Sequence, residues 1–392
     1  MTVRQKKILI LSDSYGFSNS GSRLLLDLEK AFHGEGVICD FLNPDNNQES
    51  NGRQIRFKKK QSLLLRGFSE IFLSIRFCKE IIFRDGELYH GVVSYSPSIF
   101  LVFPALIAKL KYKIPYYLIL RDIVPQWLLQ AGLINKGPSY FALSMVASLN
   151  YRVANFIGVQ SETDLTFLKT TVTDYEKIHV LRNWRFLPKF VKASLLKNHK
   201  AAAPSLKIIY AGNVGAAQNM GHIFSQLLDM NDYATVSVDV YGFGWELEKI
   251  IQGLAGHRYA DLIVFHEPIE EIELLPKLTE FDYGLVALND RLTTGNIPSK
   301  IITYLMGELS ILGIANNGSE LQKLITSNNI GAFFETTELQ NICKKKLLLK
   351  LLVANPEQRR NKISDCLQEE FCPTRAAKII IGNLLSVGSL KK

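Results

Sequence analysis

The chain has 392 residues, of which 47% are hydrophobic and 21% are charged, and it carries a formal net charge of +9 at pH 7. This length exceeds the usual limit of one hydrophobic core and predicts two domains, while the balanced composition excludes long disorder and a polytopic membrane protein. The positive charge suits nucleic acid, an anionic membrane surface or an acidic substrate, and its position along the chain must distinguish them.

Cysteine usage and the apolar runs indicate the compartment. The five cysteines are odd in number and form no C-x-x-C pair, so the sequence predicts neither a disulfide framework nor a thiolate metal site. The apolar run in MTVRQKKILILSDS is too short for a signal peptide, and residues 98–110, interrupted by Lys109, are too short to span a membrane. We therefore expect a cytoplasmic protein.

Short apolar runs alternate with segments of helical periodicity in two parts of the chain. The runs are KKILIL, VICDFL, GVVSYS, YYLIL, NFIGVQ and IHVL, and then LKIIYAG, VSVDVYG, DLIVFHEP, DYGLVAL and LSILGIA. Alternation of this kind predicts βαβ units and parallel sheets. Residues 183–204, rich in lysine, arginine and proline, interrupt it and indicate a linker. The predicted fold class is α/β, with two doubly wound Rossmann-like domains, 1–185 and 186–372, facing each other across a cleft.

Two loops of the second half have features of an anion site. In YAGNVGAAQNMGHIF, Gly212 and Gly215 permit close approach of a ligand to the backbone, and Asn213 tolerates unusual dihedral angles. In GNIPSKIITYLMG, a helix is predicted to begin near Pro298, which places Lys300 at its positive pole, where a bound anion would offset the repulsion. The alternatives are an ordinary βα turn and a lysine that extends into water.

Candidate catalytic residues of the first half lie in LRDIVPQWLLQAG, directly after a predicted strand. Asp122 is able to accept a proton from a hydroxyl, and Arg121 to bind an anion or to hold Asp122 in place. A structural ion pair is the alternative, because neighbouring residues of a strand point to opposite faces.

Several common cofactor motifs are missing. The sequence has no G-x-G-x-x-G, no H-x-x-x-H and no D-x-D, which disfavours a hydride-transfer enzyme and a bound metal. An enzyme that uses a nucleotide would then neutralise a diphosphate with cationic side chains and amides.

A basic and apolar segment, RQIRFKKKQSLLLRGFSEIFLSIRFCKEIIF, is predicted to form a helix with an apolar stripe beside cations. The stripe comprises Leu64, Phe68, Ile71, Phe72 and Ile75, and the further apolar residues Leu63, Leu65, Phe77 and Ile81 widen it. The cations are Arg53, Arg56, Lys58, Lys59, Lys60, Arg66, Arg76 and Lys79. This pattern favours contact with an anionic membrane over a core helix with a basic face, and it disfavours nucleic acid.

Taken together, these motifs resemble the GT-B glycosyltransferases of the glycosyltransferase 4 family, in particular the bacterial O-antigen and capsule branch that includes L-fucosamine transferases. The matching segments are ILILSDSYGFSNSGSRLLLDL, RDIVPQWLLQAGL, VQSETD, VLRNW, IYAGNVGAAQNM and GNIPSKIITYL. The pair AGN-x-G-x-x-Q and PSK-x-x-x-Y, which ends at Gln218 and Tyr304, is moderately specific.

The resemblance implies a retaining transferase with a UDP-sugar donor held by the second domain. Gly212, Asn213 and Gly215 would face the diphosphate, and Ser299 and Lys300 would complete its binding. The first domain would meet the acceptor through Gly21, Arg121 and Asp122. The acceptor would be a polyprenyl-diphosphate-linked saccharide at the inner face of the plasma membrane, with no cofactor or metal. The last helix, 373–390, would pack back onto the first domain.

The sequence departs from the family pattern at two positions of the donor site. Thr303 stands where many relatives have a ribose-binding glutamate, and Gln218 lies near the place of a basic residue. We expect Thr303 to offer a neutral hydroxyl and Arg291 to supply the second cation. A UDP-sugar epimerase of the same shape and a non-catalytic membrane-associated binding protein remain as alternatives.

Overall fold

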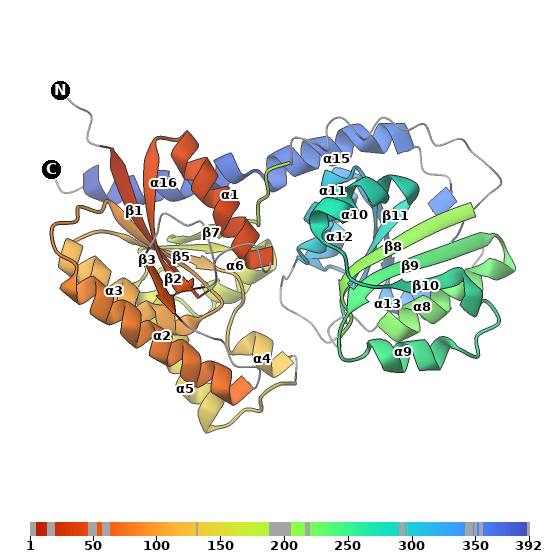
Figure 1. Ribbon diagram of the computed structural model, residues 1–392, viewed down its shortest axis with the longest axis horizontal. Coiled ribbons are helices and arrows are strands. Elements are labelled where there is room, and N and C mark those ends of the chain that lie inside the picture. Colours follow the sequence, from red (N-terminus) through yellow and green to blue (C-terminus); the bar gives the residue numbers. More distant parts are fainter. Residues whose placement is uncertain are drawn as a thin grey trace. The chain divides into compact units, whose positions relative to one another are not determined.

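The computed structural model describes residues 5–13, 20–45, 53–56, 63–130, 132–187, 205–215, 220–289, 295, 297–341, 348, 351–352 and 356–389. The chain divides into two compact units (Figure 1). Unit 1 comprises Met1–Phe186 and Cys372–Lys392, and unit 2 comprises Leu187–Phe371.

Unit 1 is a parallel sheet with helices on both faces. Its strands are β1 (Lys6–Ser12), β2 (Val37–Asp45), β3 (Arg53–Arg56), β4 (Gly91–Tyr95), β5 (Tyr116–Leu120), β6 (Phe156–Val159) and β7 (Ile178–Val180). They pair in the order β3-β2-β1-β4-β5-β6-β7. The helices are α1 (Ser20–Gly34), α2 (Leu63–Phe83), η1 (Ile99–Leu101), α3 (Val102–Tyr112), α4 (Gln126–Gln130), α5 (Pro138–Val153), α6 (Glu162–Lys169) and α16 (Pro373–Ser389).

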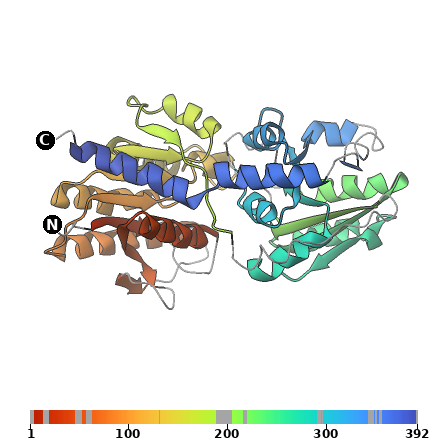
Figure 2. The same ribbon diagram turned by 90° about the horizontal axis from the view of Figure 1, so that it is seen from above.

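The continuous apolar run of β1 is explained by burial of both faces of the sheet. Ile8 and Ile10 pack in a core with α1 and α16, whereas Leu9 and Leu11 pack in a second core with α2, α3 and α5. Alternate residues of a strand point to opposite faces, so a central strand covered on both sides is apolar throughout. Helix α16 lies beside α1, where Ala377 and Ile380 are buried (Figure 2).

Unit 2 has a second parallel sheet. Its strands are β8 (Ser205–Asn213), β9 (Thr235–Phe243), β10 (Ile263–His266), β11 (Tyr283–Ala287), β12 (Ser310–Ala315) and β13 (Gly331–Glu335), in the order β10-β9-β8-β11-β12-β13. The helices are α8 (Met220–Leu228), η2 (Asp229–Asp232), α9 (Leu247–Leu254), η3 (Ala260–Leu262), α10 (Glu271–Lys277), η4 (Leu278–Glu280), α11 (Lys300–Met306), α12 (Glu320–Asn328), α13 (Thr336–Asn341) and α15 (Pro356–Glu370). The prediction of two doubly wound α/β halves is confirmed.

The strand orders mark one switch point in each unit, and the region at the strand ends beside it is called the crevice of that unit. In unit 1 the chain reverses its direction across the sheet between β1 and β4, and in unit 2 between β8 and β11. Loops diverge at such a switch point and leave a ligand-binding crevice at the carboxyl ends of the strands. Both crevices hold residues that the sequence singled out.

Candidate functional site

The crevice of unit 2 is formed by the loop after β8 and by the start of α11. Lys300 is the first residue of α11, and its Nζ atom lies 3.7 Å from the centroid of the Tyr210 ring. A Cβ atom built on Gly212 would lie only 3.5 Å from that Nζ. The structure therefore brings Lys300 and the glycine loop, residues 212–215, into contact.

The amine of Lys300 has no polar partner among the residues that the structure describes. The residue as a whole is partly exposed, but its Nζ atom is buried and makes no hydrogen bond. Burial disfavours the charged form and lowers the pKa of Lys300 to about 7. The Tyr210 ring offsets only part of the lost hydration through a cation–π contact. An anion in the crevice would supply the missing counter-charge.

The glycine loop is held by backbone contacts with the end of β9. The Val214 amide donates a hydrogen bond to the Phe243 carbonyl at 2.7 Å, and the Tyr210 hydroxyl donates to the Asn213 carbonyl at 2.5 Å. Gly244 adopts φ +149°, and a Cβ atom there would overlap the Val214 carbonyl. Gly212 adopts φ +131°, a left-handed value that favours glycine.

The other predicted donor-site residues are placed as follows. Tyr304 is fully buried, and its hydroxyl accepts a hydrogen bond from the Ala211 amide at 2.7 Å, so it supports the loop from beneath. Asn213 is exposed and Gly215 is buried. Ser299, which makes no side-chain capping bond, and Thr303 are partly exposed at the start and in the middle of α11. Gln218 and Arg291 lie outside the described residues.

The crevice of unit 1 collects polar residues from several strand ends. Arg121 follows β5, and its Nη1 atom donates a hydrogen bond to the hydroxyl of Tyr95, the last residue of β4, at 2.6 Å. The Gln160 side-chain amide donates to the Arg121 carbonyl, and the Asn183 amide donates to Gln160 Oε1 at 3.1 Å. Burial raises the pKa of Tyr95 to about 12, so its hydroxyl stays protonated.

Asp122 is partly exposed beside Arg121, and Gly21 lies in the first turn of α1. Sequence reasoning missed Asp13, Tyr95, Gln160 and Asn183, which are all buried. Each stands at or just after the end of an apolar run, in LILSD, VVSY, FIGVQ and HVLRN. That shared position is the signal that would have identified them, because parallel strands end at one edge of a sheet.

Helix α2 is apolar on two opposite sides. Phe77 and Ile81, predicted to widen the stripe, instead pack in the core, whereas Phe68, Ile71, Phe72 and Ile75 are exposed. Arg76 lies over the Phe72 ring at 5.3 Å. An apolar groove of about 450 Å³ runs between α2 and α3, lined by residues that include Ile75, Cys78, Lys79, Phe103 and Ile107.

For most of the predicted basic residues of this segment, the side chain is not described. Arg53 and Arg56 lie in β3 and Arg66 in α2, and for these three only the backbone is described, as for Leu63, Leu64 and Leu65. Lys58, Lys59 and Lys60 lie outside the described residues. Arg76 and Lys79 are exposed. Within the described ranges, no helix is both long and apolar enough to cross a membrane.

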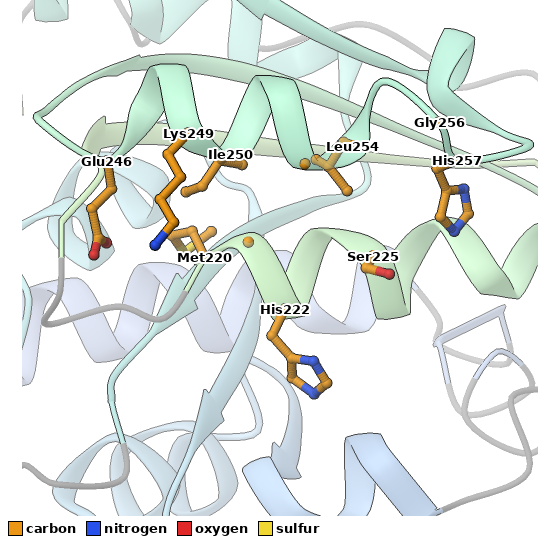
Figure 3. Close-up of a pocket in the computed structure, with 11 residues that line it drawn as sticks. Met220, His222, Ser225, Glu246, Lys249, Ile250, Leu254, Gly256 and His257 are labelled. Atoms are coloured by element: carbon orange, nitrogen blue, oxygen red, sulfur yellow. The ribbon is translucent and has the colours of Figure 1, made fainter.

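A separate depression of about 650 Å³ lies between α8 and α9 (Figure 3). Lys249 extends from α9 toward Met220 at the start of α8, whereas His222 points away from α9. None of the predicted site residues lines this depression. The described residues also contain no group of three or more His, Cys, Asp or Glu side chains arranged to hold a metal ion.

Known proteins resemble this chain in sequence and in fold. No family model matches the chain. The probable glycosyltransferase WbjE of Pseudomonas aeruginosa is 24% identical over 285 residues, which cover 69% of this chain and 68% of WbjE.

Solved structures match nearly the whole chain at low sequence identity. Sucrose-phosphate synthase of Thermosynechococcus elongatus superposes with a TM-score of 0.71 at 11% identity, covering 99% of this chain and all of that one. Anabaena HepE in complex with UDP and glucose superposes with a TM-score of 0.64 at 13% identity, covering 97% of this chain and 100% of HepE. WaaG, a glycosyltransferase involved in lipopolysaccharide biosynthesis, superposes with a TM-score of 0.62 at 12% identity, covering 96% of this chain and 100% of WaaG. The chain thus has the GT-B fold and resembles a probable glycosyltransferase in sequence.

Proposed function

We propose that this chain is a glycosyltransferase that moves a sugar from a UDP-sugar to a polyprenyl-diphosphate-linked saccharide in O-antigen or capsular polysaccharide assembly. The observation that carries this proposal is the buried, unpartnered amine of Lys300 against the glycine loop in the crevice of unit 2. Two similar proteins support it: WbjE is a probable glycosyltransferase, and HepE was solved with UDP and glucose.

The donor diphosphate would lie against residues 212–215 and Lys300. Backbone amides of the loop and the Lys300 ammonium would stabilise the negative charge that develops on UDP as the sugar leaves, and such electrostatic stabilisation often contributes most to catalysis. Ser299 and Thr303 would add neutral hydroxyl groups, and Arg291 a second cation. These groups would neutralise the charge of the diphosphate without a metal ion.

In the retaining reaction, the bond from the anomeric carbon to the UDP oxygen breaks and a bond to the acceptor oxygen forms on the same face. The acceptor proton passes to the departing phosphate oxygen, so no protein nucleophile is required. Asp122, Arg121 and Gly21 of unit 1 would bind and orient the acceptor.

The apolar face of α2 would place the enzyme on the inner face of the plasma membrane. Phe68 and Phe72 are 70% and 54% exposed, and large exposed apolar patches mark interaction surfaces. Arg76 and Lys79 beside them favour anionic lipid headgroups. The enzyme and its lipid-linked acceptor would then both lie at the membrane surface.

A transfer assay with the full chain tests this function. UDP-, GDP- and dTDP-sugars are supplied with and without a lipid-linked saccharide, and nucleoside diphosphate release and the lipid product are measured. The proposal requires UDP release that depends on the lipid acceptor. Conversion of a UDP-sugar without lipid would instead indicate an epimerase, and nucleotide binding without turnover a binding protein.

A further inference from the structure

Arg84 and Arg185 of unit 1 form ion pairs with carboxylates, whereas the partner of Arg121 is a neutral hydroxyl. Arg84 donates to Asp40 at 2.8 Å, and Arg185 to Asp27 at 2.9 Å. Within the described part of the chain, Arg121 donates to the neutral Tyr95 hydroxyl and lies 5.6 Å from the centroid of that ring, and its buried Nε has no partner there. Among the residues that the structure describes, the arginine–carboxylate pairs of unit 1 include Arg84 and Arg185 but not Arg121.

Two acidic residues also lie at this edge of the sheet. Asp13 and Asp122 both act on the Tyr95 hydroxyl electrostatically, and each has further interactions of its own. Residues 14–19, which follow Asp13, contain no acidic residue in their sequence SYGFSN. A guanidinium that is partly withdrawn from water and forms no ion pair has lost hydration, so a ligand that brings an anionic group into direct contact with it would be bound strongly.

The surroundings hold the Arg121 group in a fixed place. Its carbonyl accepts the Gln160 amide, which Asn183 holds in turn, and Tyr95, only 2% exposed, fixes one end of the guanidinium. Arg121 and Tyr95 lie at the ends of neighbouring strands, next to the switch point between β1 and β4. A planar guanidinium fixed on one side offers its remaining N–H groups to an oxyanion.

We propose that Arg121 binds an oxyanion of the substrate that occupies unit 1, and that this oxyanion is a phosphate of the acceptor's diphosphate. The inference rests on the proposed function and identifies the chemical group at its acceptor site. A carboxylate on the transferred sugar is the other source of the same chemistry, and the experiment distinguishes the two.

Isothermal titration of the full chain with farnesyl diphosphate, in the presence of saturating UDP, tests this assignment. UDP occupies the unit 2 site, so the titration reports the second anion site. We expect Arg121→Gln to weaken farnesyl diphosphate binding at least tenfold, Arg121→Lys to weaken it less, and the exposed Arg152→Gln control to bind as wild type does. Farnesol, which has no phosphate, should not distinguish these proteins.

The second arm compares UDP-glucuronate with UDP-glucose in wild type and Arg121→Gln. A loss confined to UDP-glucuronate assigns the oxyanion to the donor sugar instead. Equal affinities of wild type and Arg121→Gln for both farnesyl diphosphate and UDP-glucuronate would overturn the site. Failure of UDP itself to bind would contradict the proposed function and not this site. Melting temperatures of the variants establish that each is folded.

Discussion

Lys300 and Arg121 each have a buried nitrogen atom that makes no hydrogen bond among the described residues. The fold supplies Asp40 for Arg84 and Asp27 for Arg185, so it is able to pair a cation where a cation serves stability. Lys300 instead lies over the Tyr210 ring, and Arg121 donates to the Tyr95 hydroxyl. Unpaired charges of this kind reduce stability, and such costs are common at binding sites.

The pKa of Lys300 predicts that UDP affinity depends on pH. The free amine has a pKa near 7, whereas a bound diphosphate favours the charged form and raises it. At pH 7.5–8.5 UDP binding would therefore take up a proton, and its dissociation constant should rise by up to about tenfold per pH unit. Titration calorimetry at pH 7.5 and 8.5, in buffers of different ionisation enthalpy, measures both effects. Equal dissociation constants at the two pH values would contradict this linkage.

The same shift has a consequence for the unliganded protein. A lysine of the unfolded chain keeps its proton up to about pH 10.4, whereas folded Lys300 releases it near pH 7. The unfolded state therefore binds more protons between these values, and this group makes the free energy of unfolding rise with pH across that window. Its contribution is least favourable below pH 7, where the buried amine must be charged.

At the scale of elements, the glycine loop depends on close backbone contact between the ends of β8 and β9. Gly244→Ala would force a Cβ atom onto the Val214 carbonyl at a φ of +149°. We expect this variant to lower the melting temperature and to weaken UDP binding at least tenfold, because the loop amides would move. UDP affinity measured by calorimetry and melting by calorimetric scan test this.

The matched control is Gly253→Ala in α9, where a Cβ atom meets nothing within 4 Å. Replacing a glycine in a helix by alanine stabilises by about 0.5–1 kcal/mol, so this variant should be no less stable than wild type and should bind UDP normally. A Gly244→Ala protein with wild-type affinity would show that the loop does not hold the diphosphate.

The exposed apolar side chains of helix α2 are predicted to bind the membrane. Replacing Phe68, Phe72 and Ile75 by serine removes exposed apolar side chains while leaving the core residues Phe77 and Ile81 in place. Full burial of such a side chain contributes about 1.5–3 kcal/mol, so binding to anionic vesicles should fall at least about tenfold, or about 1.4 kcal/mol.

Cosedimentation with phosphatidylglycerol vesicles measures this loss, with neutral phosphatidylcholine vesicles for comparison. Ile272→Ser, which removes a side chain that is 61% exposed on α10 of unit 2, is the control and should bind as wild type does. If the triple variant sediments with anionic vesicles as wild type does, α2 is not the membrane surface.

At the scale of the whole molecule, the chain order of strands and helices was predictable, and the contacts between distant residues were not. Short apolar runs identified most strands, because a strand buried on both faces must be apolar. The proximity of Lys300 and the glycine loop was expected, because a helix start and a glycine loop both favour a bound anion.

The remaining features depend on tertiary packing. The Tyr210 ring under Lys300 and the Tyr95 hydroxyl on Arg121 join residues from different strands and helices, and no local pattern marks them. The periodicity of α2 was visible, but an apolar residue does not reveal whether it faces core or solvent, so Phe77 and Ile81 were assigned to the wrong side. Gln218 and Arg291 stay predictions.

The assignment of the donor site is tested most directly by measuring the affinity of the full chain for UDP in wild type, in Lys300→Met and in the exposed control Lys277→Gln. Loss of a charge-assisted interaction of about 1.5–3 kcal/mol predicts at least about tenfold weaker binding by Lys300→Met, with its melting temperature unchanged or higher and with wild-type affinity in the control. Wild-type affinity of Lys300→Met for UDP would contradict the assignment of the donor site to this crevice.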